Sequence, residues 1–176
     1  MPTCYMLIGI PGSGKSTSVK QLQEEFPSFK VASSDEYIDK IAKQKGKTYD
    51  EVHFEAIDDA TKFLKYQVNS FLKNKENFIW DQTNIVKSSR IKKLKNLISN
   101  NYSVIAIVIE LSPEELQTRL NKRTQEGGKT LSAKIIQCMI ESYEKPTYDE
   151  GFDSILLIGD NGAAMEIPKE KYKAKF

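Results

Sequence analysis

The sequence predicts an α/β fold of three layers, in which a parallel sheet of about five strands carries helices on both faces. Three observations predict it: a glycine-rich loop, the apolar run before that loop, and the alternation of apolar and helical segments along the rest of the chain. The loop, Gly9–Thr17, fills every position of the phosphate-binding pattern G-x-x-x-x-G-K-[ST]. The run Cys4–Ile8 indicates a buried strand, and Lys15–Phe26 indicates a helix. Strand, loop and helix in this order are typical of P-loop NTPases.

Length and composition allow one domain over residues 1–176, large enough to bury a proper core. The 26 basic and 24 acidic residues leave a net charge of +2, which does not by itself indicate a nucleic-acid-binding protein. Cys4 and Cys138 lie in apolar patterns without metal-ligand spacing, so we expect reduced core cysteines. With no signal-peptide pattern and no apolar run of roughly 18 residues, we expect no membrane association. The expected location is cytoplasmic, in the host cytoplasm if the protein is phage-encoded.

Apolar runs alternate with helical patterns over the rest of the chain. The run inside Tyr102–Leu111 is the richest in β-branched residues, so we expect a central strand that is buried on both faces. Ser112 and Pro113 are the residue types of a helix cap and a first helical position. Further strands are predicted over Phe29–Ser33, Asn77–Trp80 and Ile155–Ile158, and helices over about Glu36–Lys45, Tyr49–Lys73, Ser88–Ser99 and Ser132–Glu144.

The loop has the residues that binding of a nucleoside triphosphate requires. Its glycines allow a tight turn, so that successive N–H groups and the helix N-terminus point at phosphate oxygens. Lys15 is expected to reach the β- and γ-phosphates of ATP or another nucleoside triphosphate, and the Ser16 hydroxyl to bind Mg²⁺. The predicted nucleotide-binding residues are Gly9, Gly12, Ser13, Gly14, Lys15, Ser16 and Thr17.

Two carboxylates follow strands at the sheet edge where the loop lies, so they should converge with it in space. Asp35 comes after the second predicted strand and suits a base that accepts the proton of an acceptor hydroxyl; a plain helix cap is the alternative, compatible with that role. Asp81 ends the third predicted strand and suits a Mg²⁺ site; a strand-end acid without a ligand is the alternative. The candidate contacts to the acceptor are Gln82, Thr83 and Asn84.

A polar segment in the second half of the chain carries several basic residues, among them Lys122 and Lys129. Arg119 and Arg123 are four residues apart and therefore share one face of a helix. A mobile lid over about 119–131 that holds these arginines above the phosphates would stabilise the transition state and exclude water. A solvated basic turn is the alternative. With such a lid, the predicted fold is of the nucleotide-kinase type.

Two further groups of basic residues are candidates for contact with a nucleic-acid backbone. One is a helix face, and the other is the C-terminal tail over about 168–176. A solvated surface is the alternative for both groups. The helix face comprises Lys87, Arg90, Lys92, Lys93 and Lys95.

With those residues placed, the chain resembles the kinase domain of bacteriophage polynucleotide 5′-kinase over about residues 3–158. The resemblance implies transfer of the γ-phosphate of ATP to a 5′-hydroxyl of DNA or RNA. It also implies phosphate and Mg²⁺ contacts for Lys15 and Ser16, the general-base role for Asp35, and lid roles for Arg123 and Arg119. The segments that carry it are Gly9–Thr17, Asp35 to Tyr37, Thr83 and Asn84 with their strand, and the two arginines before the Ser132 helix.

Two positions depart from that family's pattern. Ile38 stands where the family usually has arginine, and Gln82 where it has aspartate; in the family both positions face the acceptor. The run Asp81–Asn84 is also similar to the kinase-like domain of heterogeneous nuclear ribonucleoprotein U, a binding module. Three functions therefore stay open: a polynucleotide 5′-hydroxyl kinase, a kinase of a nucleoside or other small molecule, and an ATP- or RNA-binding module without turnover. The presence of both Asp35 and Arg123 favours an enzyme.

Overall fold

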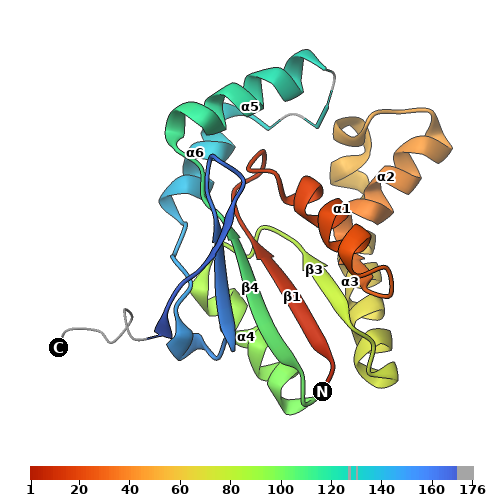
Figure 1. The fold of residues 1–176 in the computed structure, drawn as a ribbon. Helices are drawn as coiled ribbons and strands as arrows, with labels where there is room; N and C mark the ends of the chain where they lie inside the picture. Colours follow the sequence, from red (N-terminus) through yellow and green to blue (C-terminus); the bar gives the residue numbers. More distant parts are fainter. Residues whose placement is uncertain (127, 130, 170–176) are drawn as a thin grey trace.

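The computed structural model describes residues 1–126, 128–129 and 131–169 (Figure 1). Its centre is a six-stranded sheet in the order β2-β3-β1-β4-β5-β6. Five strands run parallel, as the sequence predicts, and β6 pairs with β5 antiparallel. Sequence patterning missed β6 because it is three residues long and wholly exposed, so it has no apolar alternation. The strands are β1 Thr3–Ile8, β2 Lys30–Ser33, β3 Phe78–Asp81, β4 Ser103–Ile109, β5 Ser154–Ile158 and β6 Ala164–Glu166.

The helices begin and end close to their predicted bounds, with one exception. The helix that Ser112 caps continues through much of the predicted polar segment before it ends at Gln125. The Ser112 hydroxyl accepts from the Glu115 N–H, and Pro113 occupies the first turn, as expected. The helices are α1 Lys15–Glu25, α2 Ser34–Lys45, α3 Tyr49–Asn74, α4 Lys87–Ser99, α5 Pro113–Gln125 and α6 Ala133–Glu141, with a 3₁₀ turn η1 at Tyr148–Glu150.

The sheet has an apolar layer on each face, which confirms the three-layer prediction. In β1, Leu7 faces the layer formed with α1, whereas Met6 and Ile8 face the layer formed with α3 and α4. This alternation follows from the period of two along a strand. A third cluster joins α2 to α3. In Figure 1 the glycine-rich loop lies at the end of β1 between α1 and α5, at the carboxyl edge of the sheet.

The two cysteines differ in their surroundings. Cys4 is fully buried in β1, as predicted, whereas the expectation that Cys138 belongs to the core is wrong, because it is exposed on α6. The nine residues of α6 are apolar around much of the helix, and Ile136 alone among them is buried. Along the described residues, none of the helices has the length and hydropathy that crossing a membrane requires.

Candidate active site

The glycines of the loop are needed for two different reasons. Gly12 and Gly14 have φ values of 88° and 113°, in the left-handed region that a side chain disfavours. A Cβ on Gly9 would lie 2.7 Å from Ser13 Oγ, so that position requires close approach instead. The sequence pattern therefore reflects backbone geometry that is present in the fold.

The loop presents hydrogen-bond donors that have no protein acceptor. The N–H groups of Thr17 and Ser18 donate to the Gly14 carbonyl, at 3.0 and 3.1 Å. Over the described residues, the N–H groups of Lys15 and Ser16 have no backbone acceptor, and the buried Ser13 hydroxyl has no hydrogen-bond partner. Unpaired donors at a helix N-terminus are the chemistry that binds phosphate.

Lys15 folds back over this loop. Its ammonium donates to the carbonyl oxygens of Gly9 at 2.9 Å and Ile10 at 3.0 Å. Burial lowers the pKa of Lys15 to about 8, although the negative charges of Asp81 and Asp35 act in the opposite direction. A triphosphate would give this ammonium an anionic partner in place of two neutral carbonyls.

Binding of ATP should therefore take up a proton in alkaline solution. The triphosphate raises the pKa of Lys15 again, so above about pH 8 the binding of each ATP should take up a fraction of a proton that grows with pH. By the same linkage, the affinity for ATP should fall as the pH rises above about 8. Calorimetry in two buffers of different ionisation enthalpy measures the uptake. Lys15→Ala should bind ATP more weakly and take up no proton; uptake that persists in this variant would assign the titration to another group.

Asp81 and Ser16 are the residues that would hold Mg²⁺. Burial raises the pKa of the Asp81 carboxyl, and the Lys15 charge opposes that effect, so a second cation would further stabilise the ionised form. Ser16 lies exposed in the first turn of α1. These residues would hold Mg²⁺ with phosphate oxygens and water as its other ligands, and the ion would neutralise charge on the β- and γ-phosphates. Within the described ranges, no group of three His, Cys, Asp or Glu residues forms a metal site.

Asp35 lies in the first turn of α2 and is engaged through both carboxylate oxygens. The hydroxyl of Tyr49 donates to Oδ1 at 2.7 Å, and the ammonium of Lys129 donates to Oδ2 at 3.2 Å. The alternative role of Asp35 as helix cap is wrong, because the N-cap residue is Ser33, two positions earlier. An acceptor hydroxyl that donates to Asp35 must share an oxygen with one of these two donors or displace it.

Lys129 ties the segment after α5 to α2. Its ammonium also contacts Asp39 Oδ2 at 3.1 Å and lies 4.0 Å from the centre of the Tyr49 ring. Its charge acts on Asp81 as well. No sequence motif marks the contacts of Lys129 and Tyr49 to Asp35, which cross 94 and 14 residues.

The predicted lid arginines both lie on α5. Arg119 donates from Nη1 to the Ser13 carbonyl at 2.9 Å and from Nε to Glu115 at 2.6 Å. The positive charge of Arg123 acts on Lys15. A Cβ on Gly12 would lie 2.7 Å from a methyl group of Leu120, so α5 lies directly against the loop. A continuous helix, rather than the expected polar segment, therefore carries both arginines, and Arg119 is bonded directly to the loop.

The residues after Asp81 form part of the frame of the loop. The Thr83 carbonyl accepts from the Gly9 N–H at 3.0 Å, and the Asn84 amide donates to the Leu7 carbonyl at 2.7 Å. Asn84 is buried with a φ of 48°, and its Oδ1 accepts from Lys93 at 2.5 Å. Gln82 Oε1 accepts from Trp80 Nε1 and Lys93 Nζ, at 3.1 and 2.7 Å. The side chain of Asn84 is therefore used in hydrogen bonds within the fold. Contacts of residues 82–84 to an acceptor stay a prediction.

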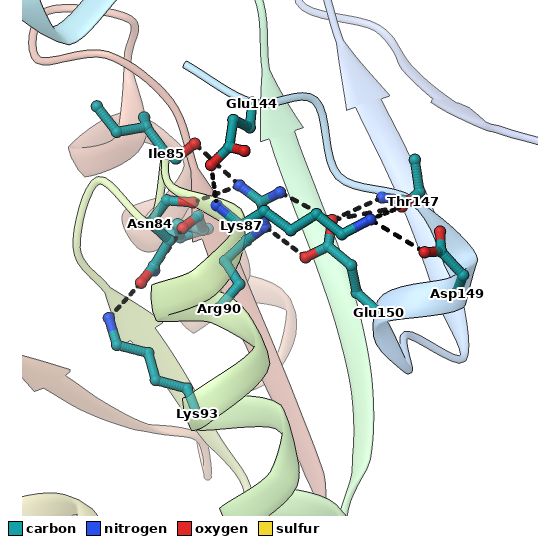
Figure 2. A network of polar contacts seen from close by, with 10 residues as sticks. Asn84, Ile85, Lys87, Arg90, Lys93, Glu144, Thr147, Asp149 and Glu150 are labelled. Carbon is teal, nitrogen blue, oxygen red and sulfur yellow. Dashed lines mark hydrogen bonds and ion pairs between the residues drawn. The ribbon is translucent and has the colours of Figure 1, made fainter. Parts of the chain in front are cut away.

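Arg90 of α4 supports the same stretch through hydrogen bonds, which Figure 2 shows. Its guanidinium forms two 2.8 Å bonds with the Glu150 carboxylate and donates from Nη1 to the carbonyls of Asn84 and Ile85, both at 3.0 Å. Both charged side chains are fully buried. The expected basic face of α4 is therefore wrong for Arg90, because that side chain points into the protein.

Position 38 does not face an acceptor in this protein. The side chain of Ile38 is fully buried in the cluster that joins α2 to α3. An arginine there would place an unpaired charge in an apolar cluster, which is costly. The expectation drawn from the family pattern is therefore wrong at this position. Of the basic tail, Lys169 is described, with its ammonium over the Tyr148 ring; residues 170–176 lie outside the described residues.

Comparison with known sequences identifies the family. The sequence model of the family described as "AAA domain" matches residues 5–146. The chain belongs to this family. The match spans the loop, Asp35, Asp81 and both α5 arginines, and the fold is that of P-loop kinases.

A human relative covers most of this AAA-domain chain. Heterogeneous nuclear ribonucleoprotein U-like protein 2 of Homo sapiens is 24% identical over 156 residues. The alignment covers 85% of this chain and 20% of the relative, so this chain spans about a fifth of that protein's length.

Three solved structures share the fold at low sequence identity. A chain of the PezAT chromosomal toxin–antitoxin system of Streptococcus pneumoniae has a TM-score of 0.72 at 18% identity, covering 94% of this chain and 70% of that one. A gluconokinase from Sinorhizobium meliloti has a TM-score of 0.57 at 17% identity, covering 97% and 86%. A chain of the Pnkp1/Rnl/Hen1 RNA repair complex has a TM-score of 0.59 at 22% identity, covering 99% and 51%. Likenesses at these identities show the fold.

Proposed function

We propose that this protein is an ATP-dependent kinase that transfers the γ-phosphate to the 5′-hydroxyl of DNA or RNA. The observation that carries the proposal is the Asp35 carboxylate in the first turn of α2, which accepts from Tyr49 and Lys129 and whose charge acts on Lys15 of the loop. A loop that only binds nucleotide would not need the Asp35 carboxylate in this position. Phosphoryl transfer needs a carboxylate that accepts the proton of the attacking hydroxyl.

The transfer assigns a step to each group. The acceptor oxygen bonds to the γ-phosphorus, the bond from that phosphorus to the β,γ-bridging oxygen breaks, and ADP leaves with the electron pair. The hydroxyl proton passes to Asp35. Lys15 and the unpaired loop donors hold the phosphates, and Arg119 and Arg123 on α5 stabilise the charge that develops on the transferred group.

Residues 119–131 would act as the lid. Lys129 occupies Oδ2 of Asp35 in the present arrangement and shares its charge with Asp39. The contact of Lys129 is the longer of the two on Asp35. Lys129 would also keep its contact to Asp39 after it leaves Asp35. We therefore assign Lys129 as the donor that yields to the acceptor hydroxyl.

The choice of acceptor draws on two supports. Similarity to a chain of an RNA repair complex supports a polynucleotide. Buried Ile38, together with similarity to a gluconokinase, supports the second candidate, a kinase of a small hydroxyl compound, because the family's arginine toward the acceptor is missing.

The two acceptors should differ in their response to salt. A polynucleotide binds partly through phosphate contacts that release counterions, so its KM should rise steeply between about 50 and 200 mM salt. A nucleoside, which carries no phosphate, should show almost no rise, and gluconate, with a single charge, only a small one. Transfer of labelled phosphate from ATP with Mg²⁺ to each compound measures both. Phosphorylation of a small hydroxyl compound but no 5′-hydroxyl oligonucleotide would establish the second candidate. No transfer to any compound would leave an ATP-binding module.

A further inference from the structure

A cavity of about 510 Å³ lies between α3 and α4, beside the carboxyl end of β3. Leu64 and Lys65 of α3 form one wall, Lys92 and Lys93 of α4 the other, and Trp80 with the stretch 82–86 completes it. The size falls within the range of roughly 300–1,000 Å³ that ligand sites occupy. The activity proposed above uses only the edge of this cavity, at Gln82–Asn84.

The cavity is cationic. Three lysines line it, and no carboxylate is among its described lining residues. Lys93 is held by neutral oxygens of Gln82 and Asn84 and lies 5.0 Å from the centre of the Trp80 ring (Figure 2 shows the bond to Asn84). In the described part of the chain, Lys65, Lys92 and Lys93 form no ion pair. Positive charge without a protein counter-charge favours an anionic ligand.

The remaining wall is apolar. Leu64, Trp80, Ile85 and Val86 line the cavity beside the lysines. An inorganic anion would make no use of that surface. A nucleotide unit would, because its base has an apolar face and its phosphate is an anion.

The cavity is linked to the phosphate-binding loop through Thr83. Thr83 lines the cavity, and its carbonyl accepts from the Gly9 N–H at the base of the loop. On the other side, Gln67 of α3, two residues beyond Lys65, accepts from the Ser33 N–H and donates to Glu36, so α3 also borders the Asp35 region. Helix α3 therefore borders both the cavity and the Asp35 region, and an acceptor strand with its 5′ end at Asp35 would follow this shared element.

We propose that this cavity holds a nucleotide of a single-stranded acceptor, with its phosphodiester on Lys65 and Lys92 and its base against Leu64 and Val86. The inference rests on the proposed function, since it names where the acceptor strand continues beyond the 5′-hydroxyl. It gives the α4 lysines a specific role in place of a general basic surface.

The test compares two double variants by fluorescence anisotropy of a labelled 5′-hydroxyl oligonucleotide, in the absence of ATP. Lys65→Ala/Lys92→Ala removes cavity lysines, and Lys73→Ala/Lys95→Ala removes exposed lysines of the same two helices that do not line the cavity. Loss of two phosphate contacts should lower the slope of log affinity against log salt by about 1.4, and affinity at 0.1 M salt by about 25-fold. The control pair should lie close to the parent protein. Equal affinities and slopes in the two pairs would overturn the proposal.

Competition and turnover separate this inference from the proposed function. Unlabelled oligonucleotide should displace the probe, whereas the same concentration of inorganic phosphate or gluconate should not; displacement by phosphate alone would overturn the nucleotide assignment. An oligonucleotide that binds through the cavity lysines without being phosphorylated would contradict the kinase activity and support the cavity. Phosphorylation with the same KM in both double variants would support the kinase activity and contradict the assignment of the cavity.

Discussion

Asp35→Asn is expected to lower turnover by about 10²–10⁴-fold while ATP affinity stays close to that of the parent protein. The amide cannot accept the hydroxyl proton as the carboxylate does, but it keeps the shape of the side chain and can still accept from Tyr49. The fold should tolerate the change, because Asp35 is half-exposed and caps no helix. Steady-state phosphorylation measures turnover, and calorimetry measures ATP binding.

Asp39→Asn is the matched control for this prediction. Asp39 is as exposed as Asp35 (55% against 52%) and contacts the same lysine, but it receives no bond from Tyr49. Its change should alter turnover only modestly. Should Asp35→Asn and Asp39→Asn have equal, small effects, Asp35 would serve only to hold Lys129, and Asp81 would become the candidate base.

Removal of one partner of the buried pair should cost the most stability. Arg90→Met is expected to lower the free energy of unfolding by about 3–5 kcal/mol, because the Glu150 carboxylate and the carbonyls of Asn84 and Ile85 lose their donors away from water. That is a large part of the roughly 5–15 kcal/mol that stabilises a domain. Urea unfolding followed by the emission of Trp80, the single tryptophan of the chain, measures the loss.

Two variants make the interpretation specific. Asp149→Asn breaks the neighbouring pair with Lys87, which is 3.0 Å long but exposed, so it should cost less than about 1 kcal/mol. The double variant Arg90→Met/Glu150→Met should recover part of the loss, since no charge is then left unpaired. A loss in Arg90→Met no greater than that in Asp149→Asn would contradict the assignment of Arg90 as a buried support for the stretch 82–86.

Local order along the chain was enough to predict the glycine-rich loop between strand and helix and most of the sheet. Glycine at positions 12 and 14 is required by the backbone itself, and Lys15 and Ser16 follow at fixed spacing, so four neighbouring positions carry the chemistry. Strands β1 and β4 are buried on both faces and therefore read as continuous apolar runs. Features of this kind depend on residues that are close in sequence.

The partners of the site depended on contacts between distant segments. Asp35 has Tyr49 and Lys129 on its oxygens, and Arg90 has Glu150, 60 residues away, because helices that the sheet brings together supply them. A lysine on α4 and a buried arginine on the same helix look alike in sequence, since side-chain burial is set by what packs against the helix. Ile38 shows the converse: a position that a family pattern assigns to the acceptor is filled here by the α2–α3 core. Only the packing of α2, α3, α4 and α5 around the carboxyl edge of the sheet decides which charges are free to meet a substrate.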